Sequence, residues 1–133
     1  MGRTIEVDKP VFSAETFLAS SRPWDYMVSL SLSDPTWTLP PQELTKLHDV
    51  LNDLDEEHLV YTLLLAESHA PELFSEDAAR FLINPSMSVR IKSYRVLRAV
   101  PAERITDRLR EAVNQGLSGC PERKDFADAL VRS

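Results

Sequence analysis

The sequence has few of the residues that build disulfide-bonded, β-rich or membrane-spanning proteins. It contains one cysteine and three glycines in 133 residues. One cysteine cannot form an internal disulfide, so we expect a reducing, cytoplasmic setting. Scarce glycine beside plentiful leucine, alanine, glutamate and arginine favours helices over sheets. No apolar run is long enough to span a membrane, and the charges within residues 3–9 leave no apolar region for a secretion signal.

Charged residues of both signs are present, but they are unevenly distributed. The net charge is −6, and 43% hydrophobic with 27% charged residues is ordinary for a globular protein. Residues 1–67 carry 12 acidic and 4 basic side chains, whereas residues 68–133 carry 9 and 11. Such asymmetry bears on partners and association rates rather than on the fold. We expect a single domain over residues 1–133.

The segment from residue 85 to residue 115 organises the chain, because it predicts two helices joined at one corner. Ser88 is the candidate N-cap of the first helix, and Pro101 ends that helix and suits the first turn of the second. Gly116 is placed as the C′ residue after the second helix. Helical spacing puts these residues on the inward faces: Val89, Ser93, Val96, Leu97, Val100, Ile105, Leu109, Ala112 and Val113. The segment therefore predicts an antiparallel helix pair.

Caps and prolines divide the rest of the chain into further helices. Helix starts are expected at or beside Ser13, Pro41, Asp55, Ser75 and Pro121. One inward stripe follows Pro41: Leu44, Leu47, Leu51 and Leu54. Another follows Pro121: Phe126, Ala129 and Leu130. The helix after Asp55 is apolar nearly all round and is expected at the centre. The sequence thus predicts an all-α protein of about six or seven helices.

Two segments allow more than one interpretation. Residues 24–33 alternate apolar residues with serines, as a half-exposed strand does, but they also fit a helical stripe that begins at Pro23. A lone strand would have no sheet to join, so we predict a helix. Residues 1–12 contain a brief β-like run without a local partner, and we predict an extended arm. Trp37 and Leu39 are expected to pack on the core from a proline-rich loop.

Weak internal correspondence accompanies these helices at an offset of 33–34 residues. The matching pairs are Leu47 with Phe81, Leu64 with Leu97, and Leu97 with Leu130. A period of this size is typical of stacked helical repeats. The residues Asn84-Pro85, Val89-Arg90, Tyr94, Leu97 and Val100-Pro101 resemble the HEAT-like repeat over about one repeat. The resemblance implies a compact α-α superhelix of stacked antiparallel helix pairs with a binding surface, and it implies no catalytic residues.

No motif in the sequence points to catalysis. The histidines His48, His58 and His69 form no i, i+4 pair, and a zinc site needs three or four converging ligands. Cys120 has no recognisable base near it, so we expect a small residue in a turn. A glycine-rich phosphate loop, a serine-hydrolase motif and a zinc-protease motif are all missing. We expect no catalytic residue, no metal and no cofactor, and an enzyme built around His58 is the least favoured alternative.

Two charge clusters are candidate binding sites. The acidic corner consists of Asp49, Asp53, Asp55, Glu56 and Glu57. Capping and first-turn charge explain most of it, but like charges at positions 49 and 53 repel each other on a helix and need another explanation. The basic face consists of Arg90, Lys92, Arg95 and Arg98. Its cations either pair with local carboxylates or contact phosphates.

These clusters lead to two functional hypotheses. The first is a non-catalytic protein-binding module whose acidic corner faces a basic protein partner. By analogy, such a small acidic module fits an immunity or antitoxin-type inhibitor of a basic toxin or effector. The alternative is a nucleic-acid-binding helical-repeat protein that uses the basic face over residues 90–110. The net charge of −6 argues against this alternative. Neither hypothesis involves a membrane.

Overall fold

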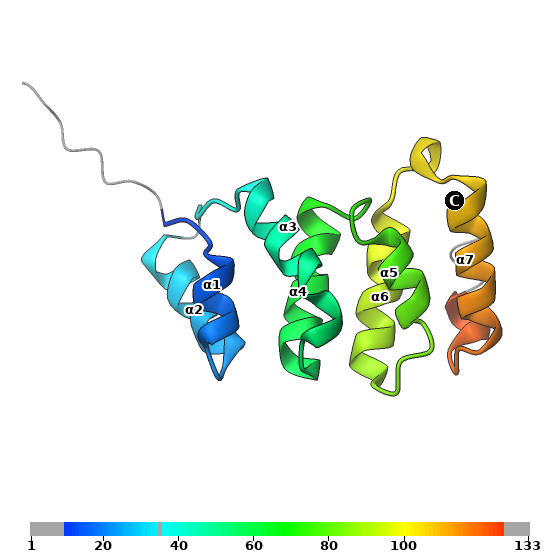
Figure 1. Cartoon of the computed structure of the whole chain (residues 1–133), viewed down its shortest axis with the longest axis horizontal. Helices are drawn as coiled ribbons and strands as arrows, with labels where there is room; N and C mark the ends of the chain where they lie inside the picture. The colour runs from blue at the N-terminus through cyan, green and yellow to red at the C-terminus, as the bar shows by residue number, and fades with distance from the viewer. Residues whose placement is uncertain (1–9, 35, 127–133) are drawn as a thin grey trace, which may run out of the picture. The chain divides into compact units, whose positions relative to one another are not determined.

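The computed structural model describes residues 10–34 and 36–126, and this part of the chain is helical. Its elements are α1 (Ala14–Ala19), α2 (Pro23–Ser33), α3 (Pro41–Asp49), η1 (Leu51–Asp53), α4 (Glu56–His69), α5 (Ser75–Phe81), α6 (Met87–Ala99), η2 (Ala102–Arg104) and α7 (Asp107–Ser118), where η marks a 3-10 helix (Figure 1). Within the described ranges, extended backbone pairs only at an isolated bridge between Val11 and Thr38. The prediction of an all-α protein is confirmed.

The chain divides into two compact units, residues 1–47 (the first unit) and residues 48–133 (the second unit). The first unit has an aromatic core. Phe12 and Phe17 are fully buried with their ring centroids 5.5 Å apart, and the rings of Tyr26 and Trp37 lie 5.6 and 6.2 Å from Phe12. Residues 1–9 of the predicted arm lie outside the described residues. The described end of the arm is packed into this core, because burying an aromatic ring is strongly favourable.

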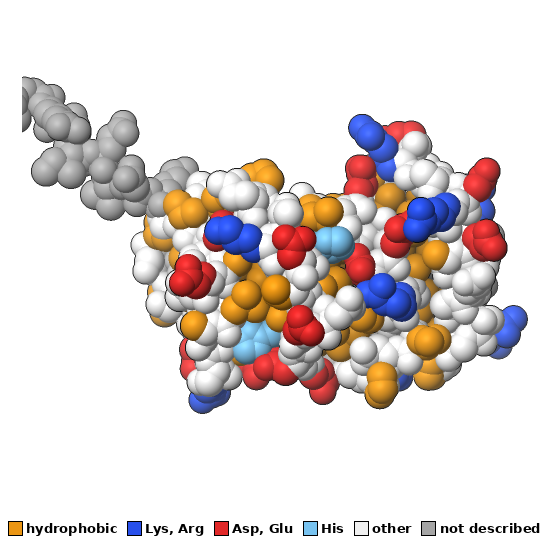
Figure 2. Space-filling model, in the orientation of Figure 1, with side chains coloured by type: hydrophobic (Ala, Val, Ile, Leu, Met, Phe, Trp, Pro, Cys, Tyr) orange, Lys and Arg blue, Asp and Glu red, His pale blue; other side chains and the backbone are white. Residues whose placement is uncertain are grey.

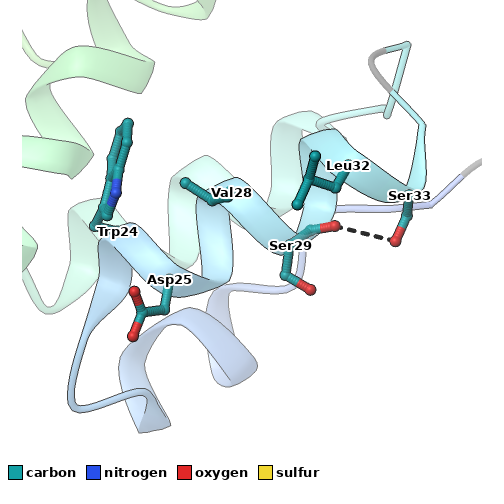
Figure 3. A pocket seen from close by; sticks show the side chains of 6 residues that line it. All are labelled: Trp24, Asp25, Val28, Ser29, Leu32 and Ser33. Atoms are coloured by element: carbon teal, nitrogen blue, oxygen red, sulfur yellow. Dashed lines mark hydrogen bonds between the residues drawn. The ribbon is translucent and has the colours of Figure 1, made fainter.

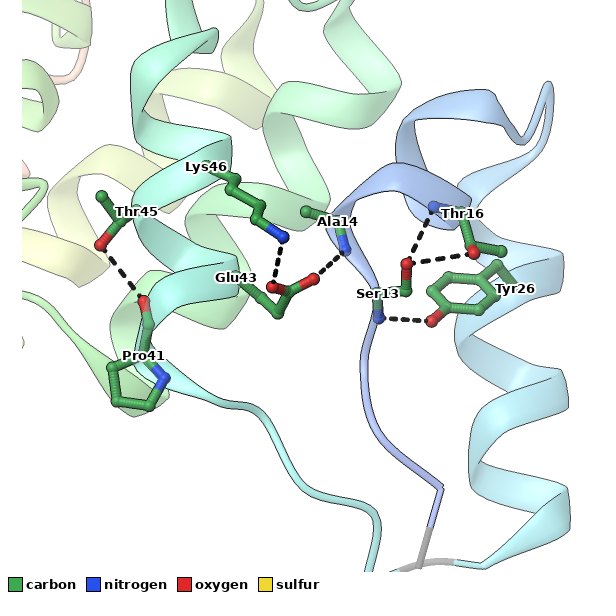
Figure 4. A network of polar contacts seen from close by, with 8 residues as sticks. All are labelled: Ser13, Ala14, Thr16, Tyr26, Pro41, Glu43, Thr45 and Lys46. Carbon is green, nitrogen blue, oxygen red and sulfur yellow. Dashed lines mark hydrogen bonds and ion pairs between the residues drawn. The ribbon is translucent and has the colours of Figure 1, made fainter.

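Polar contacts fix the start of α1 in the first unit (Figure 4). The Ser13 side chain caps α1 as predicted, and the Ser13 backbone N–H donates to the Tyr26 hydroxyl at 2.8 Å. Glu43 accepts a hydrogen bond from the Ala14 backbone N–H at 3.0 Å, and it forms an ion pair with Lys46 Nζ at 2.9 Å. The hydrogen bond from Lys46 is the largest cause that lowers the pKa of Glu43, and the hydrogen bond from Ala14 is the next largest. The helix start therefore depends on side chains from α2 and α3.

α2 confirms the helix predicted for residues 24–33. Pro23 occupies its first turn, where its missing N–H costs nothing, and the helix ends at Ser33. Pro23 and Leu30 are the buried residues of this helix, and α2 packs on α1. The alternation of serines with apolar residues does not produce a strand, because an isolated strand leaves its backbone hydrogen bonds unmade.

The second unit stacks its helices in two layers. α4 packs on α6, and α5 packs on α7 as well as on α6 (Figure 1). α4 and α6 begin at residues 56 and 87, and α5 and α7 begin at residues 75 and 107, close to the spacing expected of a repeat. The buried apolar residues of this core include Leu63, Phe74, Ala78, Ala79, Leu82, Val89, Val96 and Leu97. Their burial supplies the main driving force for the stack.

The leucine helix predicted after Pro41 is shorter than expected. α3 ends at Asp49, and the chain continues as the 3-10 helix η1. The buried leucines are Leu44, Leu47 and Leu51, whereas Leu54 is half-buried beyond η1. Because the α-helix stops before Asp53, the charges at positions 49 and 53 do not share one helical face. Their predicted i, i+4 repulsion is therefore wrong.

Two predicted N-caps are displaced along the chain. Ser86 caps α6 by accepting the Val89 backbone N–H at 3.3 Å, whereas Ser88 is the second residue of that helix. Ser75 is the first residue of α5 rather than its cap, and its hydroxyl donates to the carbonyl of Glu72 at 2.9 Å. Ser86 and Ser88 offer equivalent caps near the start of α6, so local sequence alone does not choose between them.

The corner after α6 is longer than predicted. Pro101 follows α6 but leads only into η2. α7 begins at Asp107, with the Thr106 hydroxyl accepting the Leu109 backbone N–H at 3.1 Å as its N-cap. Ile105 therefore lies outside the helix in which it was predicted. A threonine cap with an acidic residue after it starts a helix more effectively than a proline alone.

Gly116 is a buried residue inside α7 and not the C′ residue that the sequence predicted. A Cβ atom at this position would clash with the carbonyl oxygen of Ala79 on α5. The glycine is therefore needed for the close approach of α5 and α7. α7 makes its main contact with α5, so the pair predicted from residues 85–115 is part of a stack rather than a separate hairpin.

The last predicted helix is described only at its start. Residues 123–126 are helical, and the inward Phe126 is buried with its ring stacked on Tyr94 at a centroid distance of 4.3 Å. The predicted inward positions Ala129 and Leu130 lie outside the described residues. The described turn therefore covers one face of α6.

Candidate functional site

The acidic corner lies in the second unit, along the connection that leads from α3 into α4. Asp49 ends α3, Asp53 ends η1, Asp55 caps α4, and Glu56 and Glu57 are the first residues of α4. All five residues are exposed. The structure thus places the predicted residues along one short connection, with each carboxylate accessible to solvent.

No lysine or arginine of the described residues forms an ion pair with any carboxylate of the acidic corner. Asp55 Oδ1 lies 2.8 Å from His58 Nδ1, and Glu56 Oε1 accepts the Ser86 hydroxyl at 2.6 Å. The hydrogen bond from the His58 backbone N–H is the main cause that lowers the pKa of Asp55. The negative charge of the corner therefore remains available to an external partner.

Two hollows border the acidic corner where α4 and α6 begin. The first has a volume of about 320 Å³, and the residues that line it include Leu54, Glu56, Leu59, Pro85, Ser86 and Val89. The second has a volume of about 290 Å³ and is lined by Glu56, Glu57, Val60, Tyr61 and Ser88. Glu56 lines both hollows. Each combines apolar side chains with at least one carboxylate, as binding sites for amphipathic side chains do.

The basic face is less available than the sequence suggested. Arg90 Nε donates to Glu122 Oε1 at 2.7 Å, and Arg90 Nη1 donates to the carbonyls of Asn84 and Pro85 at 2.9 and 3.1 Å. The bond to Glu122 raises the pKa of Arg90. Only 11% of the Arg90 side chain is exposed. Arg90 therefore ties the start of α6 to the segment after α7, which is a structural role.

The remaining cations of the basic face have mixed surroundings. Arg95 Nε lies 3.0 Å from Glu67 Oε1, an ion pair without hydrogen-bond geometry. Arg98 and Arg95 line a hollow of about 290 Å³ together with Glu67 and Ala99. Arg98 and Lys92 form no ion pair with the described part of the chain. Figure 2 shows acidic and basic side chains interspersed on the visible face of the molecule.

Two of the residues considered for catalysis, His48 and Cys120, are either in contact with neighbouring side chains or buried. His48 Nε2 lies 2.7 Å from Asp77 Oδ2, and the His48 ring stands edge-on to Phe74 at 5.1 Å. Burial raises the pKa of the Cys120 thiol, which makes its thiolate less available. Among the described residues, no group of three or more histidine, cysteine, aspartate or glutamate residues could hold a metal ion.

The sequence did not predict that the stripe along α2 would lie at the surface. Trp24, Val28 and Leu32 recur at every fourth residue, and their side chains point to the same side of the helix in Figure 3, away from Asp25 and Ser29. Trp24 is 52% exposed and Leu32 is 81% exposed. The stripe borders an open hollow of about 460 Å³. The sequence contains this stripe, but periodicity alone does not tell an outer apolar face from an inner one.

No family model, curated protein or solved structure matches this chain. In the part of the chain that the structure describes, no helix has the length and apolar character needed to cross a membrane.

Proposed function

We propose that the protein is a non-catalytic protein-binding module that presents its acidic corner to a basic protein partner. The observation that carries this proposal is the contrast in pairing among the described residues. The five carboxylates of the corner have no lysine or arginine partner, whereas Arg90 and Arg95 of the basic face are each paired with a glutamate. Unneutralised carboxylates attract a cationic surface and accelerate its association.

Helix capping accounts for part of the acidic corner but not for all of it. Asp55, Glu56 and Glu57 lie where the α4 dipole favours negative charge. That helix end is equivalent to only about half a positive charge, so it does not neutralise the corner. Asp49 and Asp53 lie before this turn and gain nothing from it as first-turn charges. Binding to a basic partner gives their exposed charge a role.

Two further parts of the proposal concern the class of protein. The stacking of α4 on α6 and of α5 on α7 supports a HEAT-like repeat in the second unit. A small acidic repeat module of this kind suits an immunity or antitoxin-type inhibitor that binds a basic toxin or effector in the cytoplasm. This step is an analogy, because a fold does not determine a partner.

Binding of nucleic acid through the basic face is less well supported. Phosphate binding gains affinity from each cation that is free to replace a counterion. Arg90 is engaged with Glu122 and two carbonyls, and Arg95 is engaged with Glu67. Arg98 and Lys92 alone provide a small cationic surface in a chain whose net charge is −6.

Two double variants separate these hypotheses. Asp49→Lys with Asp53→Lys reverses charge at two exposed positions, and we expect it to slow association with the partner by about tenfold or more at low salt. Arg95→Glu with Arg98→Glu should change that rate by less than about twofold. Both variants and the wild-type protein are measured against the partner purified from the native lysate, after far-UV circular dichroism has shown that each is folded.

The same measurements identify the alternative. If nucleic acid is the ligand, the arginine variant loses binding, and the wild-type affinity falls steeply as salt is added. Equal association rates for all three folded proteins would contradict a role for either charge cluster.

A further inference from the structure

Two hollows lie beside the acidic corner at the N-terminal ends of α4 and α6, and together we call them the groove. Glu56, the first residue of α4, lines both hollows. Its carboxylate accepts a hydrogen bond from the hydroxyl of Ser86, the N-cap of α6, and so links the two helices. Leu59 and Val89 are buried under the first hollow, and Val60 contributes an apolar surface to the second. These contacts lie within the second unit, between helices that pack directly on each other. The groove is thus built from the first turns of α4 and α6 and from loop residues that precede them.

We infer that this groove receives an arginine side chain from the protein partner, an inference that rests on the proposed function. The hollow lined by Glu57, Val60, Tyr61 and Ser88 has the chemistry that arginine needs. Its apolar side chains suit the methylene stem, and its carboxylates suit the guanidinium. The aromatic ring of Tyr61 adds a surface on which a guanidinium stacks.

Charge complementarity decides in favour of a cation. The N-termini of α4 and α6 both begin at this groove, and each contributes about half a positive charge that would favour an anion. Glu56 and Glu57 line the hollows, and no lysine or arginine of the described residues pairs with any carboxylate of the acidic corner. The first turn of α6 has no acidic residue of its own. Glu56 accepts a hydrogen bond from Ser86, the N-cap of α6, so the Glu56 carboxylate already balances the positive end of that helix.

Glu57 is the carboxylate best suited to bind the guanidinium. One oxygen of Glu56 is engaged by Ser86, whereas Glu57 has no ion pair with the described residues and lines the hollow beside Tyr61. A guanidinium forms two parallel hydrogen bonds to one carboxylate, which a lysine ammonium does not. The groove therefore favours arginine over lysine.

A peptide titration tests this inference directly. The probe is a synthetic peptide of alternating glycine and arginine, and the controls are peptides with citrulline or lysine in place of arginine. We expect the arginine peptide to shift the amide NMR signals of residues 56–61 and 86–89 in the full chain. The citrulline peptide, which has the same shape without the charge, should shift none of them. The lysine peptide should bind about threefold more weakly or worse.

A matched pair of variants separates the groove from the acidic charge. Ser88→Trp fills the second hollow and leaves every carboxylate in place, so we expect it to weaken binding of the arginine peptide by about tenfold. Ser118→Trp adds the same side chain at an exposed position at the end of α7 and should bind within about twofold of the wild-type protein. Far-UV circular dichroism checks that both variants are folded.

The outcomes distinguish the groove from the proposed function. Undiminished binding by folded Ser88→Trp, or amide shifts spread equally over α5 and α7, would overturn the groove as an arginine site. If the native partner is slowed by Asp49→Lys with Asp53→Lys but not by Ser88→Trp, the acidic corner binds a basic protein without using the groove. If neither variant slows it, the proposed function fails as well.

Discussion

Two hydroxyl groups in the core of the second unit have no hydrogen-bond partner among the described residues. They are Thr62 Oγ1 on α4 and Ser93 Oγ on α6, and both side chains are fully buried. A hydroxyl that loses water without gaining a partner costs about 1–3 kcal/mol in proteins. These hydroxyls therefore lower the stability of the interface between α4 and α6, and a conservative substitution that removes one of them should restore part of it.

We expect Thr62→Val to raise the free energy of unfolding by about 1 kcal/mol, because valine keeps the shape of threonine and removes the unpaired hydroxyl. Urea denaturation measures the change. Thr62→Ser is the control: it keeps the hydroxyl, removes a buried methyl group and should lower stability by about 1 kcal/mol. A valine variant less stable than the wild-type protein would show that the hydroxyl is satisfied by a buried water.

Asp55 gives the second residue-scale prediction, which concerns pH. Its folded pKa is lowered from a reference of 3.8, chiefly by the His58 backbone N–H. A lowered carboxylate pKa adds stability above the unfolded pKa, and this contribution is lost as pH falls through the folded value. Asp55→Asn keeps a capping side chain without the charge, so we expect it to be less stable by about 0.5 kcal/mol at neutral pH, a small value because the carboxylate is exposed.

The difference between Asp55→Asn and the wild-type protein should shrink as pH falls from about 3.8 and disappear below the lower folded pKa, where the wild-type carboxylate is neutral in both the folded and the unfolded states. Urea midpoints at several pH values between 5 and 2 measure this convergence, and other carboxylates cancel because they are common to both proteins. A gap that stays constant over this range would mean that the charge of Asp55 contributes nothing to the cap.

At the scale of one helix, α2 has two apolar faces with opposite surroundings. Leu30 is 8% exposed and Leu32 is 81% exposed. We expect Leu30→Ala to cost about 2–5 kcal/mol of stability through cavity formation. Leu32→Ala should change it by less than about 0.5 kcal/mol, because a solvated side chain leaves no cavity. Urea denaturation compares the two, and similar large losses in both variants would show that the outer stripe is covered in solution.

Local signals predicted most helix starts, and tertiary contacts decided the exceptions. Ser13 and Asp55 cap their helices as predicted, because a cap depends only on the next few residues. Gly116 was misassigned, because a glycine that ends a helix and a glycine that admits a neighbouring helix look alike in sequence. The carbonyl of Ala79 that requires it lies far away in the chain.

At the scale of the whole molecule, the two units differ in size and in their spectroscopic reporters. Both tryptophans, Trp24 and Trp37, belong to the first unit, whereas α4 to α7 belong to the second. Domains below about 60 residues are only marginally stable, and the first unit ends at Leu47. We expect tryptophan fluorescence to report unfolding at a lower urea concentration than far-UV circular dichroism does.

The comparison uses one protein sample and two probes, so it needs no reference protein. Trp24→Phe serves as the control, because it leaves Trp37 near Phe12 as the only tryptophan of the aromatic core. Coincident curves from both probes would contradict the prediction and would mean that the chain unfolds as one cooperative unit.

The sequence predicted which charged residues cluster, but it did not predict which of them form ion pairs within the chain. The sequence identified both charge clusters, because residues that are close in the chain stay close in a helix or in a short connection. It did not predict that Arg90 would be held by Glu122 after α7, since that contact joins distant parts of the chain. It also did not predict the hollows around Glu56, which depend on how closely α4 and α6 pack.

The burial of Cys120 has a practical consequence for chemical labelling. Only 6% of this residue is exposed, and burial raises the pKa of its thiol, so it reacts slowly with maleimides and iodoacetamides at neutral pH. A cysteine introduced at the exposed position of Ser88 would be the faster thiol in the native chain. A photo-crosslinker can therefore be attached beside the groove without first replacing Cys120, and any protein that docks there can be covalently trapped.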